Sequence, residues 1–328
     1  MLVFLFVLLS LLVGWKNSHH VPATDWVKKQ TSQIDTHDRL CNEFPDPGNI
    51  AIAVKTGATE AVERIPILMH TALRCAQNVM IFSDLEEDIV GYHLHDAIAD
   101  IPASVMEGNP EFNFYQRLKD AQKYGQIKGM LGDAPNPRVP GQLAAWALDK
   151  YKQLHILEKL YASYQDKDWY MLMDADTYVV WPNLLMWTDQ LPDPRTERLY
   201  LGASTYMSGR FFAHGGSGML ISQAATHEFA VVNKGIATSW DQRMLDECCG
   251  DLAIGQAFEK IGIPVSPAGP TLNGAKPLNL PFGPTHWCQP VVTMHHVLQN
   301  EMNDITNFEL SRNETKVWSA QIRNLAQI

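Results

Sequence analysis

Two acidic residues separated by a single residue are the clearest chemical signal in the chain. Asp174 and Asp176 flank Ala175 and follow an entirely apolar segment, residues 169–173 (WYMLM). In an extended segment, residues two apart point to the same side, so both carboxylates would face one site. Mn²⁺ and Mg²⁺ prefer oxygen ligands and often complete their shells with phosphate oxygens. The pattern predicts a divalent cation on Asp174 and Asp176, with a pair of solvated turn acids as the alternative.

The apolar segment before this acidic pair predicts a strand. Because residues 169–173 are apolar on both faces, we expect that strand in the middle of a sheet covered on both sides. Ligands of open α/β sheets bind at the carboxyl ends of strands. The acidic pair therefore stands where an α/β protein places a site.

Upstream segments predict the start of an α/β nucleotide-binding fold. Residues 49–54 (NIAIAV) and 78–83 (NVMIFS) are short apolar runs suited to buried strands. Between them, residues 61–77 have apolar positions at helical spacing, and we expect Pro66 in the first turn of the main helix. Strand, helix and strand in this order are typical of α/β folds.

Downstream of residues 128–142, a loop rich in glycine and proline, one long helix is predicted over 143–164. Further strands are expected near 200–203 and 219–222. The apolar stripe of the helix, which we expect to pack in the core, consists of Trp146, Tyr151, Leu154, Leu157 and Leu160 or Tyr161. The chain would thus form one α/β domain over residues 49–300, followed by a helical tail over 301–328.

Composition narrows the function classes. The chain has 328 residues, of which 46% are hydrophobic and 19% charged, so it can bury a sizeable core. Its formal net charge is -10, and it has no cluster of five or more Lys and Arg residues. A nucleic-acid partner requires a basic surface, so that class is disfavoured. An anionic ligand would need local positive charge, from a few Lys or Arg residues or from a metal.

The amino terminus predicts entry into the secretory pathway. Residues 2–13 are apolar except for Ser10. This run is long enough for a signal-peptide core but short for a helix that spans a membrane. We expect residues 1–15 to be a signal peptide or a short signal anchor, and 16–48 to be a stem. Asn313 begins an N-glycosylation sequon. The expected location is the lumen of the ER or Golgi, with membrane anchoring or secretion left open.

Five cysteines are compatible with an oxidising lumen. None forms a C-x-x-C pair, which disfavours a structural zinc site built on cysteines. One or two disulfides are expected there. The expected disulfide bonds join Cys41 to Cys75, and Cys288 to Cys248 or Cys249.

Several blocks of the sequence resemble glycosyltransferase family 31, which includes the Fringe and core-1 β1,3-galactosyltransferases. Residues 167–179 (KDWYMLMDADTYV) resemble the D-x-D region of that family, most of all in its uncharacterised fungal members. Further blocks follow the family's order and bring the resemblance to about residues 50–297: residues 54–57 (VKTG) with Arg74, 214–222 (HGGSGMLIS), 249–255 (CGDLAIG) and 293–297 (TMHHV).

The resemblance implies a GT-A type fold and inverting transfer of a hexose from a UDP-sugar to an acceptor hydroxyl, of β1,3 type. The acceptor would be a glycan, glycoprotein or glycolipid. Asp174 and Asp176 with His295 would hold Mn²⁺ or Mg²⁺ against the diphosphate. Asp251 would take the proton from the acceptor hydroxyl. One displacement from the opposite face needs only that one base.

Two of these assignments have structural alternatives. Asp251 precedes a predicted helix over 252–261 and could serve as its N-cap. His295 and His296 are adjacent, so in a strand they would face opposite ways and only one could bind the metal. His295 matches the motif position better.

Among the residues expected to contact donor or acceptor, three kinds have a structural alternative. Lysines on the long helix could reach the diphosphate or be solvated, glycines could permit close approach or merely a tight turn, and a tryptophan could stack on a sugar ring or pack locally. The full set is Lys55, Thr56, Arg74, Lys150, Lys152, Ala175, Gly215, Gly216, Gly218 and Trp287.

The chain also departs from the family pattern, and two rival functions follow. Ala175 replaces the middle acid of the metal motif, and Gly250 replaces the first of two acids before the helix, which puts acceptor chemistry in more doubt than metal binding. A catalytically inactive sugar- or UDP-binding protein is one alternative. A haloacid-dehalogenase type phosphatase also uses D-x-D after a strand, but Tyr178 stands where that class has Thr or Val.

Overall fold

The computed structural model describes residues 40–127, 130, 134–281, 283–312 and 321–322. The chain divides into two compact units, residues 1–43 and 44–328, and the elements described below belong to the second unit. The expected leader, most of the stem and the sequon at Asn313 lie outside the described residues. Within the described part, no helix is both long and apolar enough to cross a membrane.

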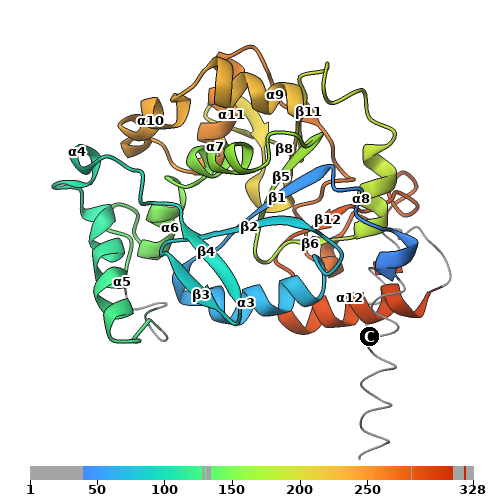
Figure 1. The fold of residues 1–328 in the computed structure, drawn as a ribbon, viewed down its shortest axis with the longest axis horizontal. Coiled ribbons are helices and arrows are strands. Elements are labelled where there is room, and N and C mark those ends of the chain that lie inside the picture. The colour runs from blue at the N-terminus through green and yellow to red at the C-terminus, as the bar shows by residue number, and fades with distance from the viewer. Residues whose placement is uncertain (1–39, 128–129, 131–133, 282, 313–320, 323–328) are drawn as a thin grey trace, which may run out of the picture. The chain divides into compact units, whose positions relative to one another are not determined.

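An eight-stranded mixed sheet forms the centre of the second unit (Figure 1). Its strand order is β11-β7-β10-β5-β1-β2-β4-β3. Neighbours run parallel at β11–β7, β5–β1, β1–β2 and β2–β4, and antiparallel at the other three pairs. This confirms the predicted α/β class with a mixed, mostly parallel sheet. The strands are β1 (Ile50–Lys55), β2 (Asn78–Ser83), β3 (Glu87–Ile89), β4 (Tyr92–Asp96), β5 (Trp169–Asp174), β7 (Tyr200–Gly202), β10 (Met219–Ser222) and β11 (Ser266–Pro267).

Two small antiparallel ribbons stand beside this sheet. One pairs β6 (Tyr178–Val179) with β12 (Thr293–Met294), and the other pairs β8 (Ser204–Met207) with β9 (Arg210–Ala213). The first ribbon joins the segment after the acidic pair to the segment before the two histidines, although they are far apart in the sequence.

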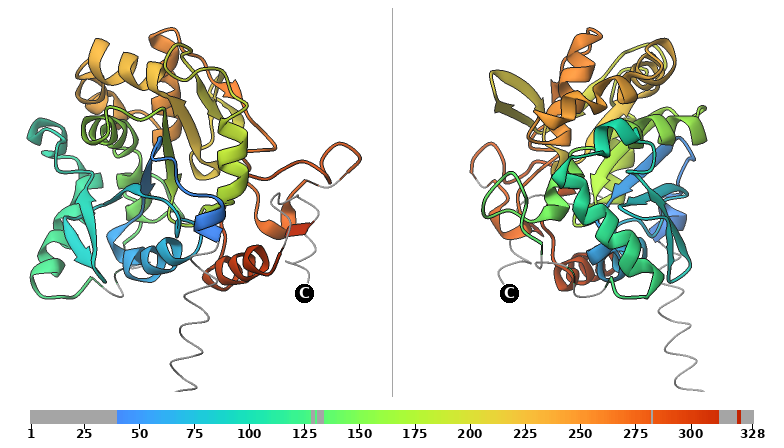
Figure 2. Two further views of the ribbon diagram at one scale, coloured as in Figure 1. Left: turned by 45° about the vertical axis from the view of Figure 1, so that its right-hand side comes forward. Right: turned by 90° about the vertical axis from the view of Figure 1, so that its left-hand side faces the viewer.

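Helices cover both faces of the sheet. In Figure 1, α7, α9, α10 and α11 lie on one side, and α3 and α12 lie together on the other. Figure 2 also shows α12 beside α3. The helices are α3 (Ala58–His70), α4 (Ala103–Met106), α5 (Asn113–Lys123), α6 (Ala144–Asp149), α7 (Gln153–Ser163), α8 (Trp181–Thr188), α9 (Gln223–His227), α10 (Ile236–Asp241), α11 (Gly250–Lys260) and α12 (Gln299–Ser311).

Strand β5 has the central position predicted from its composition. Its residues 169–173 are all buried, and it lies between β1 and β10. The last residues of β1 and β5, Lys55 and Asp174, are register partners, and Phe82 of β2 is the partner of Lys55 on the other side. Three neighbouring parallel strands therefore end at one edge, which is the edge that carries the acidic pair.

The single helix predicted over 143–164 is wrong. The structure has two helices, α6 and α7, which are separated by residues 150–152. Lys150 and Lys152 turn inward there, and their side chains are buried because each finds a buried carboxylate partner. Trp146 of the predicted stripe is 67% exposed, whereas the remaining members are buried. Helical spacing alone could not reveal this break, because its cause lies in partners distant in sequence.

The predicted position of Pro66 is also wrong. Helix α3 begins at Ala58, and Pro66 lies well inside it. The backbone N–H of Ala58 donates a 3.0 Å hydrogen bond to the Asp84 carboxylate, which follows β2. This long-range cap satisfies an N–H that the first turn of a helix leaves without a partner, and so lets the helix begin early.

The cysteine predictions have a mixed outcome. Cys41 and Cys75 are each disulfide-bonded. Cys248 and Cys249 are bonded to one another, and Cys288 is a free, exposed thiol. The predicted bond between Cys288 and Cys248 or Cys249 is therefore wrong. The disulfide between these two adjacent cysteines directly precedes α11.

Candidate active site

The acidic pair begins at the end of β5 and is held against β1. Asp174 is the last residue of β5, and one of its oxygens lies 3.1 Å from Nζ of Lys55, the last residue of β1. The backbone N–H of Ala175 donates a 2.9 Å hydrogen bond to the carbonyl of Lys55. Ala175, between the two carboxylates in sequence, is buried.

Asp176 collects several nitrogen atoms around its carboxylate. Its Oδ1 lies 3.2 Å from Nε2 of His295, and its Oδ2 lies 3.2 Å from Nδ1 of His296. Nη1 of Arg64, on α3, is also 3.2 Å from Oδ2. The same Nε2 of His295 is 3.8 Å from Asp174. The structure thus brings together the three metal ligands expected from the sequence and adds His296.

The two histidines do not face opposite ways, as an extended strand would require. Strand β12 ends at Met294, and His296 has φ 55°, in the left-handed region. The rings consequently stack with centroids 3.7 Å apart, and both reach Asp176. The expectation that the two rings face opposite ways assumed strand alternation that has already ended, whereas binding of a metal by only one of them stays a prediction. In the sequence, the signal that could have indicated His296 as a site residue was its position directly after His295.

A glycine-rich turn supplies the opposite wall of the site. Gly215–Ser217 forms a single 3-10 turn, and Gly218 follows with φ 79°, which favours glycine. A Cβ on Gly216 would lie 2.1 Å from the His295 ring, so only glycine permits this approach. The hydroxyl of Thr177 donates a 2.8 Å hydrogen bond to the carbonyl of Gly216 and fixes the turn beside the acidic pair.

Asp251 lies on the other side of the same turn. The backbone N–H of Gly215 donates to its Oδ2 over 3.1 Å, while its Oδ1 accepts from the N–H of Leu252 over 2.9 Å. Asp251 is half-buried in the first turn of α11, where the N-cap residue is Cys249. The N-cap alternative for Asp251 is therefore wrong, and its carboxylate is held toward the glycine turn.

The glycine that departs from the family pattern has a packing reason. A Cβ on Gly250 would lie 2.6 Å from Cγ of Gln153 and 3.0 Å from the carbonyl oxygen of Lys150. Helix α11 begins directly against the break between α6 and α7. An acidic side chain at this position would have no room, so its absence follows from packing.

A charge network of buried and half-buried side chains lies beside the site. Lys55 pairs with Asp149 as well as with Asp174. Nζ of Lys152 lies 2.7 Å from Asp84 and 3.2 Å from Asp149, and it donates to the carbonyl of Thr56 over 2.9 Å. Lys152 is buried, so it positions neighbouring elements and is not a solvated helix lysine.

This network sets the protonation states of its members. Burial alone would lower the pKa of Lys55, but Asp149 and Asp174 raise it above the usual range, so Lys55 stays charged. Burial would raise the pKa of Asp149, but Lys55 and Lys152 lower it to about 2. The pKa of Asp174 is raised by burial and by the nearby charges of Asp149 and Asp176, against the effect of Lys55.

Asp176 differs from its neighbour in the acidic pair. Burial would raise its pKa, but the hydrogen bond and charge of His295, followed by Arg64 and His296, lower it below the usual range. The Asp176 side chain therefore stays ionised as a carboxylate. Carboxylates bind divalent cations in their ionised form, which suits this role.

Three predicted contact residues are not brought to the site by any described contact. Arg74 lies 3.5 Å from Glu309, and both side chains are buried. Lys150 pairs with Glu111 over 3.0 Å, in a second buried cluster. Trp287 is 52% exposed, in a turn. Arg74 and Lys150 have structural partners that a sequence motif could not reveal.

The donor set suits a divalent cation. Two ligands about 2.1 Å from a cation in adjacent octahedral positions lie about 3 Å apart. The Asp176–His295 and Asp174–His295 separations of 3.2 and 3.8 Å come close to that spacing. Carboxylate oxygens with one or two imidazoles suit Mn²⁺ or a similar ion. The arrangement therefore fits a cation on Asp174, Asp176 and His295, with His296 as an additional donor.

A pocket of about 350 Å³ adjoins this group. It lies between α3 and the start of α12, and both Ala175 and Arg64 line it. Its volume is within the range of small-ligand sites. Arg64 therefore stands between the acidic pair and a cavity large enough for part of a ligand.

Comparison with known proteins identifies similar structures but no family. No protein-family model matches the chain, and no curated protein matches it. Among solved structures, it is similar to a glycosyltransferase involved in glycosylation of the major capsid of PBCV-1, with 10% identity over 79% of this chain and 99% of that one (TM-score 0.41). An active-site mutant of LgtC has 10% identity, covering 84% and 95% of the two chains (TM-score 0.40). The glycosyltransferase GlyE of Streptococcus pneumoniae TIGR4 has 12% identity, covering 85% and 60% (TM-score 0.39).

Proposed function

We propose that this chain is a metal-dependent inverting glycosyltransferase that moves a hexose from a UDP-sugar to an acceptor hydroxyl, in a β1,3-type linkage, in the secretory pathway. One observation carries the proposal. Consecutive glycines join the two chemical halves of the site: Gly215 donates to Asp251, and Gly216 lies directly against His295. A candidate general base and a candidate metal ligand therefore face one short turn of backbone.

Asp174, Asp176 and His295, with His296, would hold Mn²⁺ or Mg²⁺. A cation bound there would neutralise charge on the departing diphosphate. Lys55 and Arg64 add positive side chains beside the same carboxylates. These side chains would orient the diphosphate of the donor in a chain whose net charge of -10 otherwise repels it.

Asp251 would act as the general base. The acceptor oxygen forms a bond to the anomeric carbon while the bond from that carbon to the diphosphate oxygen breaks, and UDP leaves with the bonding pair. The acceptor proton passes to a carboxylate oxygen of Asp251, which the N–H of Gly215 orients. Attack from the face opposite the leaving group inverts the anomeric centre, and no second catalytic carboxylate is needed.

The test is UDP release from a panel of UDP-sugars with Mn²⁺, with EDTA and with an Asp174→Asn/Asp176→Asn variant. Asp120→Asn is the matched control, because Asp120 is an exposed acid whose ion pair among the described residues is with Lys123. The proposal expects donor-selective release that needs Mn²⁺ and disappears in the double variant but not in the control. Mn²⁺-dependent UDP binding without release, even with acceptors, would instead favour a sugar- or UDP-binding protein. The absence of any UDP binding would overturn the proposal.

A further inference from the structure

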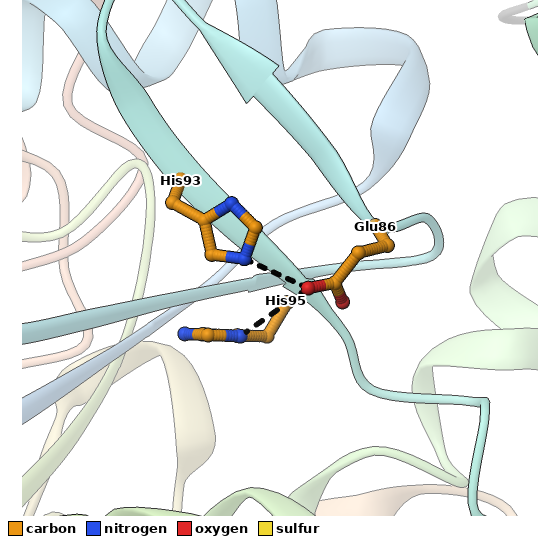
Figure 3. A group of neighbouring side chains, drawn as sticks. All are labelled: Glu86, His93 and His95. Atoms are coloured by element: carbon orange, nitrogen blue, oxygen red, sulfur yellow. Dashed lines mark hydrogen bonds and ion pairs between the residues drawn. The ribbon is translucent and has the colours of Figure 1, made fainter.

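A second group of metal-binding side chains lies at the edge of the sheet. His93 and His95 are two residues apart on β4, so their side chains leave the same face of the strand. Glu86 precedes β3, the antiparallel neighbour of β4. Figure 3 shows both imidazoles directed at the Glu86 carboxylate. Strands β2 and β1 separate β4 from β5, so this group is distinct from the Asp174–Asp176 site.

The three side chains offer ligand atoms at metal-binding separations. Oε1 of Glu86 lies 2.7 Å from Nε2 of His93 and 3.7 Å from Nδ1 of His95. One atom from each residue falls within 4.8 Å of the other two. Ligands about 2.1 Å from a tetrahedral Zn²⁺ lie about 3.4 Å apart. Glu86 is exposed, so a small rotation of its side chain suffices to open the shorter separation.

Neighbouring groups orient each ligand. Nδ1 of His93 lies 2.9 Å from Oδ1 of Asp88, so in the tautomer protonated at Nδ1 its Nε2 is left to bind a metal. A carboxylate behind a ligating histidine is the usual support in zinc sites. The other oxygen of Glu86 accepts a 2.8 Å hydrogen bond from the backbone N–H of Asp96. The ring of His95 packs on Phe82, with centroids 5.5 Å apart.

We propose that Glu86, His93 and His95 form a Zn²⁺ site that clips the edge of the sheet. Two imidazoles and one carboxylate are a common zinc donor set, and they leave a fourth position for water or an exogenous ligand. The ligands come from β4 and from the turn leading into β3. Bound zinc therefore links the edge strand to its neighbour, and the site does not depend on the proposed transferase activity.

The test is Zn²⁺ titration by calorimetry of the full-length protein after removal of metals with EDTA. An Asp174→Asn/Asp176→Asn background weakens the other candidate cation site. In that background the proposal expects one equivalent of zinc to remain. His95→Ala or His93→Ala should then weaken binding at least tenfold, and zinc should raise the melting temperature only where both histidines are present.

Further variants keep the result decisive. Glu86→Gln retains the size of the side chain while removing its charge, and it is also expected to weaken zinc binding. His227→Ala is the matched control, because His227 is an exposed histidine outside both groups. Circular dichroism of the metal-free variants checks their fold. Zinc affinity that is unchanged by His93→Ala and His95→Ala, or already lost in the Asp174→Asn/Asp176→Asn background, would overturn the proposal.

Discussion

Lys152 and Asp84 form an ion pair of 2.7 Å in which each side chain is 1% exposed. The same carboxylate caps the first N–H of α3 at Ala58. The pair joins the residue after β2 to the residue before α7 and lies behind the strand ends that carry the candidate site. A buried charge that loses its partner is expensive, so these two residues act as one unit.

We expect Asp84→Ala to lower the free energy of unfolding by about 3–5 kcal/mol, because it leaves the Lys152 ammonium buried without this partner. Urea denaturation followed by circular dichroism measures the change. Asp120→Ala, which removes an exposed pair with Lys123, should alter stability by less than about 1 kcal/mol. Equal effects of the two substitutions would show that the buried pair does not have the assigned role.

Gly216→Ala should disable the site while leaving the fold intact. The new Cβ would meet the His295 ring at 2.1 Å, so the ring must move away from the acidic pair. We expect UDP release to fall at least tenfold and Mn²⁺ affinity to fall with it. Gly283→Ala is the control, because a Cβ there has no neighbour within 4 Å. Full activity of Gly216→Ala would contradict the placement of His295.

The two histidines should contribute unequally to Mn²⁺ binding. Nε2 of His295 approaches both acidic residues, whereas His296 approaches Asp176 and is more exposed. We expect His295→Ala to abolish measurable binding and His296→Ala to weaken it about tenfold. Electron paramagnetic resonance of free Mn²⁺ gives the affinities, with His286→Ala as the control. A larger loss in His296→Ala would reverse the assignment of the principal nitrogen ligand.

The lowered pKa of Asp149 predicts that the folded state loses stability in acid. Its pKa is lowered to about 2 in the folded state by Lys55 and Lys152, against about 4 for an ordinary aspartate. A group with a lowered folded pKa contributes stability above its unfolded pKa and loses it as pH falls toward the folded value. Between pH 4 and about 2, the wild type should therefore lose more stability than Asp149→Asn. Melting temperatures across that range test this, and parallel curves would refute it.

Local patterns predicted the core of the fold well. The apolar run before Asp174, the short runs of β1 and β2, and the acidic pair itself depend on periodicity and composition, which act over a few residues. Strand positions and the edge of the sheet that carries the site follow from them.

Several of the errors share one physical cause, which is a partner distant in sequence. Asp84 starts α3 early, and the buried carboxylates draw Lys150 and Lys152 inward and break the predicted helix. Arg74 pairs with Glu309 for the same reason. The position of His296 depends on a left-handed residue after a two-residue strand, which periodicity does not encode.

The ribbon of β6 and β12 has a consequence for biosynthesis. Its strands bring His296 to Asp176 across 120 residues of sequence. A ribosome that adds about 5–20 residues per second makes the acidic pair on the order of ten seconds before the imidazoles. Sheet strands β1, β2 and β5 can already associate in that interval, but the candidate cation site lacks its two imidazoles. A nascent chain therefore acquires the full set of candidate ligands only after both histidines have been synthesised.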